Sequence, residues 1–259
     1  MSRSVRLTVA IPTCGRPDKL AKAVASFNRS SVPLDIVVWD SLPNDTNREL
    51  ASNTENVQLY ESRTLTGPAE SRYELGQRIQ TELVIFADDD HFPRPNAVET
   101  LIRLMHRYPD VDMLSVRWSR GGKDHALTQQ LRFGYGEEGN RTVQKVFGFP
   151  DEVVDLGLNL VQTDVTTPTF ITRASVLSHV AFDPRFEFYF DLWDFGMQIH
   201  DARLRSYATP LANFEHEPGG YGDTATKRSV DKSVDRDRFI SKWGVVPIGS
   251  TGARKDWQT

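Results

Sequence analysis

One stretch decides the fold: residues 83–90 read Leu-Val-Ile-Phe-Ala-Asp-Asp-Asp. Four apolar residues rich in β-formers run directly into three carboxylates. A continuous apolar run is typical of a strand that is covered on both faces of its sheet. Ligands of open α/β sheets bind at the carboxyl ends of the strands, where these acids stand. The stretch alone fits two interpretations, a divalent cation beside a phosphate-bearing ligand or a polar turn with solvated acids.

The composition is that of a globular protein. Of the 259 residues, 39% are apolar and 25% are charged, which suffices for one large α/β domain or two small ones. The net charge of −4 provides no basic field, so nucleic acid is an unlikely partner. The single cysteine, Cys14, excludes an intrachain disulfide framework and fits a reducing compartment.

No transmembrane segment is predicted, because no apolar run approaches the roughly 20 residues that a spanning helix needs. The apolar run behind the basic N-terminus is short and enters a Pro-Thr turn, so a secretory signal is not expected either. We therefore expect a soluble, cytoplasmic protein, with a peripheral position at a membrane left open.

Strands and helices alternate through the first half of the chain. This is the pattern of a mostly parallel, doubly wound α/β sheet. Right-handed crossovers would bring the loops after the first, second and fourth strands to one edge of that sheet. Strands are predicted at 5–11, 34–39, 57–60, 83–86 and 113–118, and helices over 17–27, 69–80 and 95–105.

The shared edge would carry Thr13, Asp40 and the acids 88–90, and a nucleotide lying across it would meet all three loops. The Gly-x-Gly-x-x-Gly fingerprint is absent after the first strand, and so is a Walker P-loop. A dinucleotide-dependent redox enzyme and a P-loop phosphotransferase are therefore disfavoured.

Four motifs in order resemble those of family 2 glycosyltransferases. Residues 9–13 resemble the family's opening strand and turn, and residues 37–41 its second strand, which ends in an acid and a serine. Residues 67–76 resemble its Gly-x-Ala-x-x-Arg-Asn-x-Gly helix start, with Tyr73 in place of the Asn. Residues 86–90 then occupy the place of the metal-binding Asp-x-Asp motif. Four motifs in the family's order are far more specific than any one alone.

The resemblance implies a GT-A fold, a nucleoside-diphosphate sugar as donor and a divalent metal, Mn²⁺ or Mg²⁺. It makes Asp90 the metal-ligating acid and places Asp88 near the ribose or the metal. Asp89, between them, is expected with Asp88 among the residues that contact the donor. A hard cation with oxygen ligands would let carboxylates and a diphosphate lie close together.

The resemblance also implies contacts to the donor. Asp40 could accept the N3–H of a uracil ring, and Pro12 and Thr13 could line the base. The Arg72 guanidinium could donate paired hydrogen bonds to the diphosphate, and Arg16 is expected to contact the donor as well. The plain alternatives are that Asp40 is a turn acid and Arg72 a solvated helix residue.

The segment from 119 to 164 has weak periodicity and several glycines, so we expect a long irregular stretch. It either shapes the acceptor site or is a decorated surface loop. Beyond it, we expect strands at 167–171 and 206–214, a short helix at 174–180, a closing helix over 235–244 and a mobile tail over 248–259.

Residues 190–199 resemble the family's acidic helix, with Asp191 at the position of its Glu and Leu192 where a second acid often stands. Asp191 and Asp194 are three residues apart and so share one helix face. We favour Asp191 as general base, because the start of a helix stabilises a carboxylate. Asp194 would then hold acceptor or sugar hydroxyls. The alternative is that both acids are helix-start residues.

His216 follows the last long strand and precedes several glycines that would let a loop close over the nucleotide. The resemblance makes it a candidate metal ligand or diphosphate contact, and a structural histidine is the alternative.

Together these features predict a single GT-A domain with two halves, residues 1–118 for the nucleotide sugar and residues 119–259 for the acceptor and the catalytic base. The expected reaction moves a sugar, with inversion, from a UDP-sugar in preference to a GDP- or dTDP-sugar. The acceptor hydroxyl could belong to a glycan, a lipid-linked sugar, a small molecule or another compound. A nucleotidyltransferase is one alternative, although it usually has a Gly-rich basic loop where this chain has only Gly15-Arg16. A non-catalytic nucleotide-sugar or carbohydrate-binding protein is the other.

Overall fold

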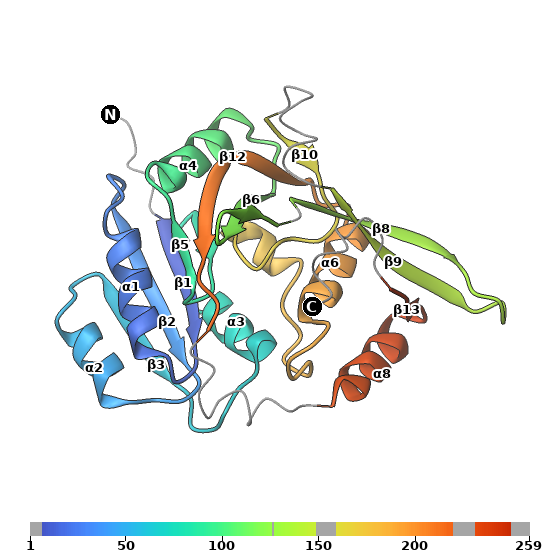
Figure 1. Ribbon diagram of the computed structural model, residues 1–259, viewed down its shortest axis with the longest axis horizontal. Coiled ribbons are helices and arrows are strands. Elements are labelled where there is room, and N and C mark those ends of the chain that lie inside the picture. The colour runs from blue at the N-terminus through green and yellow to red at the C-terminus, as the bar shows by residue number, and fades with distance from the viewer. Residues whose placement is uncertain (1–6, 126, 149–158, 220–230, 250–259) are drawn as a thin grey trace.

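The computed structural model describes residues 7–125, 127–148, 159–219 and 231–249 (Figure 1). Its centre is a ten-stranded sheet with the main order β10-β12-β6-β11-β4-β1-β2-β3. The first half supplies four adjacent parallel strands, which confirms the predicted doubly wound arrangement. These strands and their helices are β1 (Leu7–Thr13), α1 (Pro17–Phe27), β2 (Leu34–Asp40), α2 (Asp45–Ser52), β3 (Val57–Glu61), α3 (Pro68–Gly76), β4 (Leu83–Phe86) and α4 (Ala97–Arg107).

Strand β4 is covered on both faces, as its apolar run predicts. Leu83 and Ile85 pack with α1 and α4 in one core, whereas Val84 and Phe86 pack with α3 and with later elements in another. All four side chains are fully buried. Because β1 lies between β2 and β4, the loops after these three strands meet at one edge.

The second half extends the sheet and returns to the same edge. Strand β11 (Phe170–Arg173) runs antiparallel between β4 and β6 (Met113–Arg120), and β12 (Ser206–His216) runs parallel to β6. The end of β12 pairs with a short strand that sequence reasoning missed, β5 (His91–Pro93), so that His216 lies opposite His91. Other elements of this half are β7 (Lys123–Asp124), β10 (Val161–Gln162), the 3₁₀ helix η1 (Ala174–Ser178), α6 (Asp191–Asp201) and α8 (Lys232–Trp243).

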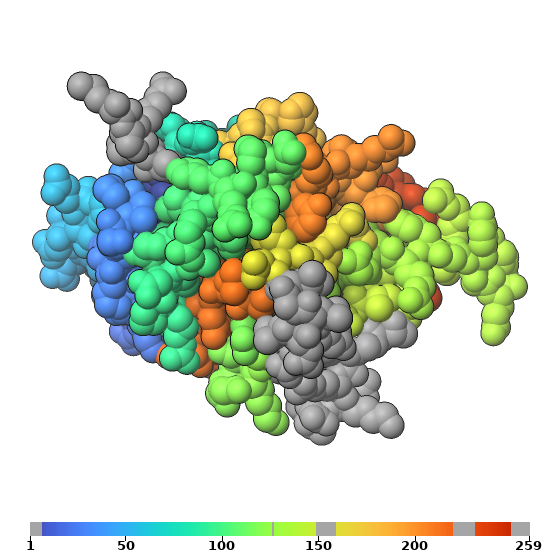
Figure 2. All heavy atoms as spheres, turned by 90° about the horizontal axis from the view of Figure 1, so that it is seen from above, coloured from blue at the N-terminus to red at the C-terminus, as the bar shows by residue number. Residues whose placement is uncertain are grey.

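The expectation of an irregular segment from 119 to 164 is wrong. Much of it forms a hairpin of β8 (Thr128–Tyr135) and β9 (Arg141–Gly148), to which β13 (Val246–Pro247) adds a third strand. The hairpin protrudes from one end of the molecule (Figure 2). Leu131 and Val143 are buried, but Phe133, which lies opposite Val143 in the register, and Tyr135, nearer the tip, are exposed. A hairpin that leaves the core has no constant buried face, and so it lacks the alternation that predicts a strand.

Helix α2 was also missed, because Asn47 is its only buried residue and no apolar stripe marks it. The closing helix is confirmed as α8, while the expected mobile tail lies outside the described residues from 250 onward. None of the helices in the described ranges combines the length and the apolar character that crossing a bilayer requires.

Candidate active site

A cavity of about 210 Å³ opens at the carboxyl ends of β1, β2 and β4, and we call it the strand-end cavity. Segments from both halves of the chain line it. Most of the residues that the sequence singled out for donor and metal binding are among them. The lining residues include Pro12, Thr13, Arg16, Ser41, Thr66, Ser71, Arg72, Asp88, Asp90, His91, Trp118, Phe188 and His216.

Asp89 points away from this cavity and fastens the loop after β1. Its carboxylate accepts a hydrogen bond of 2.6 Å from the Thr13 hydroxyl and pairs with the Arg16 guanidinium. Burial raises the pKa of Asp89 to about 7, against the opposing effect of Arg16. The expected contact between Asp89 and the donor is therefore not supported, because the side chain is fully buried and its oxygens hold Thr13 and Arg16.

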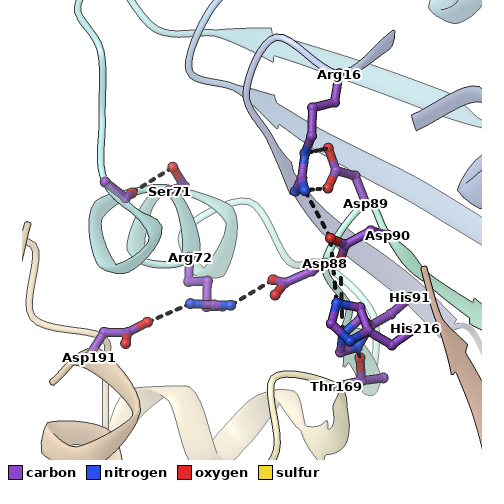
Figure 3. Close-up of polar contacts among 11 residues, drawn as sticks. Arg16, Ser71, Arg72, Asp88, Asp89, Asp90, His91, Thr169, Asp191 and His216 are labelled. Carbon is purple, nitrogen blue, oxygen red and sulfur yellow. Dashed lines mark hydrogen bonds and ion pairs between the residues drawn. The ribbon is translucent and has the colours of Figure 1, made fainter. Parts of the chain in front are cut away.

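Asp90, His91 and His216 form a cluster that could hold a metal ion, with one ligand atom from each lying within 4.8 Å of the others. The Asp90 carboxylate lies 3.7 Å from His216 Nε2 and 3.9 Å from His91 Nε2. The Nδ1 of His91 lies 2.6 Å from the Thr169 hydroxyl, which orients the ring so that Nε2 faces Asp90 (Figure 3). Such outer partners are typical of metal-binding histidines.

The charge states of this cluster suit a cation. Burial lowers the pKa of His91 to about 4, so its imidazole is neutral at pH 7, as a metal ligand must be. Burial also opposes ionisation of Asp90, but the nearby His216 imidazole and the charge of Arg16 hold the pKa of that carboxyl below its usual value. One carboxylate and two imidazoles form a plausible donor set for a divalent transition metal such as Mn²⁺.

Sequence reasoning missed His91 as a member of this cluster. Its position directly after Asp90 was the available signal. What could not be read was the pairing of β5 with β12, which brings His91 and His216 together.

Arg72 joins the two halves of the chain. It is only 4% exposed, and it donates hydrogen bonds of 2.6 Å to Asp88 after β4 and to Asp191 at the start of α6 (Figure 3). The alternative of a solvated helix residue is therefore wrong. Burial raises the pKa of Asp191, and the Arg72 charge partly offsets that effect.

The start of α6 is held from two sides. Asp235 of α8 is fully buried and accepts hydrogen bonds from the backbone amides of residues 187–189, at 3.0, 2.9 and 2.7 Å. At Gly67 a Cβ atom would lie 1.7 Å from the Glu187 carbonyl oxygen, so only glycine lets α3 approach this loop. Phe190 then adopts φ = 62°, a left-handed conformation that is uncommon for a bulky residue. These contacts fix the position of the neighbouring Asp191.

Asp40 stands at the predicted edge, opposite Thr13 in the register of β1 and β2. Its carboxylate is fully buried and accepts hydrogen bonds from Asn47 Nδ2 at 2.6 Å and from the Leu42 amide at 2.9 Å. In this arrangement it secures the start of α2, and the expected contact with a uracil ring is not supported.

Asp194 is also fully buried, on the side of α6 that meets α8. Its carboxylate accepts hydrogen bonds of 2.8 Å from Trp243 Nε1 and from Gln198 Nε2, and it pairs with Lys242 at 2.7 Å. It thus fastens α6 to α8. The expectation that Asp194 holds sugar or acceptor hydroxyls is not supported.

A hydroxyl cluster that the sequence did not indicate lines the other side of the strand-end cavity. The Ser41 hydroxyl lies 2.7 Å from that of Thr66 and 3.0 Å from that of Ser71. The Thr66 hydroxyl also accepts a hydrogen bond of 3.1 Å from Trp39 Nε1. The cluster provides neutral donors and acceptors between the loop after β2 and the start of α3.

Comparison with known protein families identifies the chain. The family described as "Glycosyl transferase family 2" matches residues 8–177, which is more than half of the sequence. The chain belongs to glycosyltransferase family 2. No curated protein sequence matches it.

Solved structures with the GT-A fold resemble this glycosyltransferase. GalNAc-T7 with UDP, GalNAc and Mn²⁺ aligns with a TM-score of 0.63 and 12% identity over 83% of this chain and 44% of that one. S. aureus TarS 1–349 in complex with UDP-GlcNAc aligns with a TM-score of 0.64 and 15% identity, over 92% of this chain and 66% of that one. The mannosyltransferase PcManGT from Pyrobaculum calidifontis with GDP-Man and Mn²⁺ aligns with a TM-score of 0.59 and 14% identity, over 87% of this chain and 61% of that one. The chain thus spans less than two thirds of each of these proteins.

Family membership supports a glycosyltransferase and favours it over both a nucleotidyltransferase and a non-catalytic binding protein. The family match ends at residue 177. It covers Thr13, Arg72 and the acids 88–90, but Asp191 and His216 lie beyond it. The three-dimensional contacts of these two residues, with Arg72 and with Asp90, therefore connect them to the matched region.

Proposed function

We propose that this glycosyltransferase transfers a sugar from a nucleoside-diphosphate sugar, with a UDP-sugar as the first candidate, to an acceptor hydroxyl with inversion at the anomeric carbon. The observation that carries this proposal is the meeting of two groups at one cavity. The Asp90–His91–His216 cluster lines the strand-end cavity together with Arg72, and Arg72 in turn holds Asp191 at 2.6 Å.

Asp90, His91 and His216 would hold a divalent cation, Mn²⁺ or Mg²⁺, with Asp88 nearby for the ribose or the metal. The cation would supply charge neutralisation for the leaving diphosphate. Arg72 presents a buried, permanently charged guanidinium to the same cavity and would favour the diphosphate further. Residues 1–118 would thus bind most of the donor.

Asp191 would take the proton from the acceptor hydroxyl. A general base needs a pKa near the working pH, and burial raises the pKa of this carboxyl. Arg72 orients the carboxylate through the 2.6 Å contact. A single base opposite the leaving group implies direct displacement and therefore inversion. Residues 119–259 would supply this base and the acceptor site.

The test is nucleotide release from a panel of UDP-, GDP- and dTDP-sugars with Mn²⁺ present. We expect release from one donor class, its loss on chelation, and its loss in Asp90→Asn. Asp110→Asn, which changes an aspartate whose side chain is 76% exposed and which lies outside the strand-end cavity, is the matched control. Undiminished turnover by Asp90→Asn in the presence of chelator would refute the metal assignment, and NMR of the product anomer decides between inversion and retention.

A further inference from the structure

A second cavity, of about 490 Å³, lies on the far side of Asp191 from the strand-end cavity. It is formed by the start of α6, strand β9, the end of β13 and helix α8, which Figure 1 shows together at one end of the molecule. We call it the aromatic cavity, because three aromatic residues in succession line it. Its lining includes Phe188, Tyr189, Phe190, Asp191 and Trp193.

Lys145 of β9 lines this cavity and is 7% exposed. Its ammonium lies 4.5 Å from the centre of the Trp193 ring, and no hydrogen bond or ion pair joins it to another residue in the described ranges. Burial lowers the pKa of Lys145 to about 7, although the charge of Asp191 opposes that effect. A buried ammonium without a counterion is costly, so the cavity favours a ligand that supplies a negative charge.

Two further cations line the same cavity, Lys232 and Arg236 of α8. The Lys232 ammonium lies 5.6 Å from the centre of the Tyr189 ring. Among the described lining residues the only acid is Asp191, and its carboxylate already pairs with Arg72 at 2.6 Å. Arg236 also lies 3.9 Å from the carboxylate of Asp237, so Lys145 and Lys232 are the lining cations without an ion pair in the described ranges, and they leave the cavity positive in a chain whose net charge is −4.

The two cavities adjoin. Phe188 lines both, and Asp191 lines the aromatic cavity while its partner Arg72 lines the strand-end cavity. A molecule in the aromatic cavity can therefore bring a hydroxyl to Asp191 from the side opposite Asp88.

We propose that the aromatic cavity binds the acceptor and that the acceptor is a small hydroxyl compound with a phosphate or carboxylate group. Aromatic rings provide flat apolar faces for a sugar or polyol, and Lys145 with Lys232 and Arg236 receives the anion. The inference rests on the proposed function for the role of Asp191. The positive, aromatic lining supports anion binding independently of it.

The test is calorimetric titration with glucose, glucose 6-phosphate, glucuronate and inorganic phosphate. We expect at least one charged sugar to bind about tenfold or more tightly than glucose, because charge-assisted contacts add at least that factor. Comparison of glucose 6-phosphate with glucuronate separates a phosphate from a carboxylate preference. Equal or absent binding of charged and neutral sugars overturns the proposal, and so does binding that inorganic phosphate alone reproduces with equal affinity.

The variant Lys145→Met removes the buried charge and keeps the length of the side chain. It should abolish the advantage of the charged sugar, whereas Lys123→Met, in the exposed strand β7, should preserve it. Lys232→Met, at an exposed position, provides a second variant if Lys145→Met does not fold. An advantage that survives in the folded Lys145→Met and Lys232→Met variants overturns the proposal.

Titration of the wild-type protein with UDP and Mn²⁺ tests the proposed function separately. Binding of UDP and Mn²⁺ without any preference for charged sugars would contradict the acceptor assignment and keep the glycosyltransferase proposal. The reverse result would contradict the donor assignment and retain an anion site in the aromatic cavity.

Discussion

The ion bridge of Arg72 provides the sharpest test of how the two halves are held together. Arg72→Met removes both 2.6 Å contacts but retains most of the buried volume. The side chain of Asp191 is 12% exposed and would lose its counterion inside the protein, whereas Asp88, at 27%, regains more water. Removing one partner of a buried pair costs about 3–5 kcal/mol. Because Asp191 carries most of the penalty, we expect the lower end, about 3 kcal/mol of unfolding free energy at pH 8.

Urea unfolding measures this loss, provided that the m-value stays constant between the proteins. Arg48→Met is a matched control, because Arg48 also bridges two carboxylates, Asp45 at 2.6 Å and Glu61 at 2.8 Å, but at the surface. Exposed pairs of this kind contribute little, so the control should unfold close to the wild type.

The loss should also depend on pH. Burial raises the folded-state pKa of Asp191, and removal of Arg72 raises it further. The penalty comes from the ionised carboxylate, so it is complete above that pKa and shrinks as acid protonates the group. The gap between wild type and Arg72→Met should therefore be larger at pH 8 than at pH 5. A loss no greater than that of Arg48→Met, or one that is independent of pH, would refute the reasoning.

Three further predictions, with four substitutions, concern the surroundings of the site. Gly67→Ala places a Cβ 1.7 Å from the Glu187 carbonyl oxygen, so we expect a loss of about 3 kcal/mol or more in urea unfolding; a loss below 1 kcal/mol would show that the loop yields freely. His91→Ala should weaken Mn²⁺ binding in calorimetry by more than the roughly tenfold effect of losing an outer-shell partner, and unchanged affinity would remove His91 from the metal cluster. Asp191→Asn should bind UDP but fail in transfer, whereas Asp194→Asn should chiefly lower stability; the opposite pattern would make Asp194 the base.

The fold around β4 could be predicted because the apolar residues of this strand directly indicate that both of its faces are buried. A strand with helices on both faces must be apolar at every position, and residues 83–86 satisfy two separate cores at once. The sequence of the β8–β9 hairpin contains no comparable pattern of apolar residues. Its buried apolar residues, Leu131 and Val143, stand among buried polar residues such as Thr142 and Lys145, and the turn between the strands contains two glycines, Gly136 and Gly139.

The sequence predicts which strand or helix carries each candidate site residue, but it does not predict which way the side chain points. Asp40 and Asp194 lie on the expected strand and helix, yet both turn into the protein, where Asn47 and Lys242 provide partners. Whether an acid at a strand or helix end faces a cavity depends on groups that arrive from elsewhere in the chain. The direction of the Asp235 side chain likewise depends on a distant segment, because its three backbone partners belong to the loop before α6.

The three consecutive acids show how much of the site depends on one turn. The His91 amide donates to the Asp88 carbonyl oxygen at 3.0 Å, and this turn sends Asp88 and Asp90 into the strand-end cavity but Asp89 into the protein. Arg72 pairs with Asp88 and Arg16 pairs with Asp89, while Asp90 accepts a hydrogen bond of 2.8 Å from Arg16 and lies 3.7 Å from the His216 imidazole. The middle acid of the Asp-x-Asp spacing therefore anchors the loop, whereas its two neighbours line the cavity that a ligand would enter.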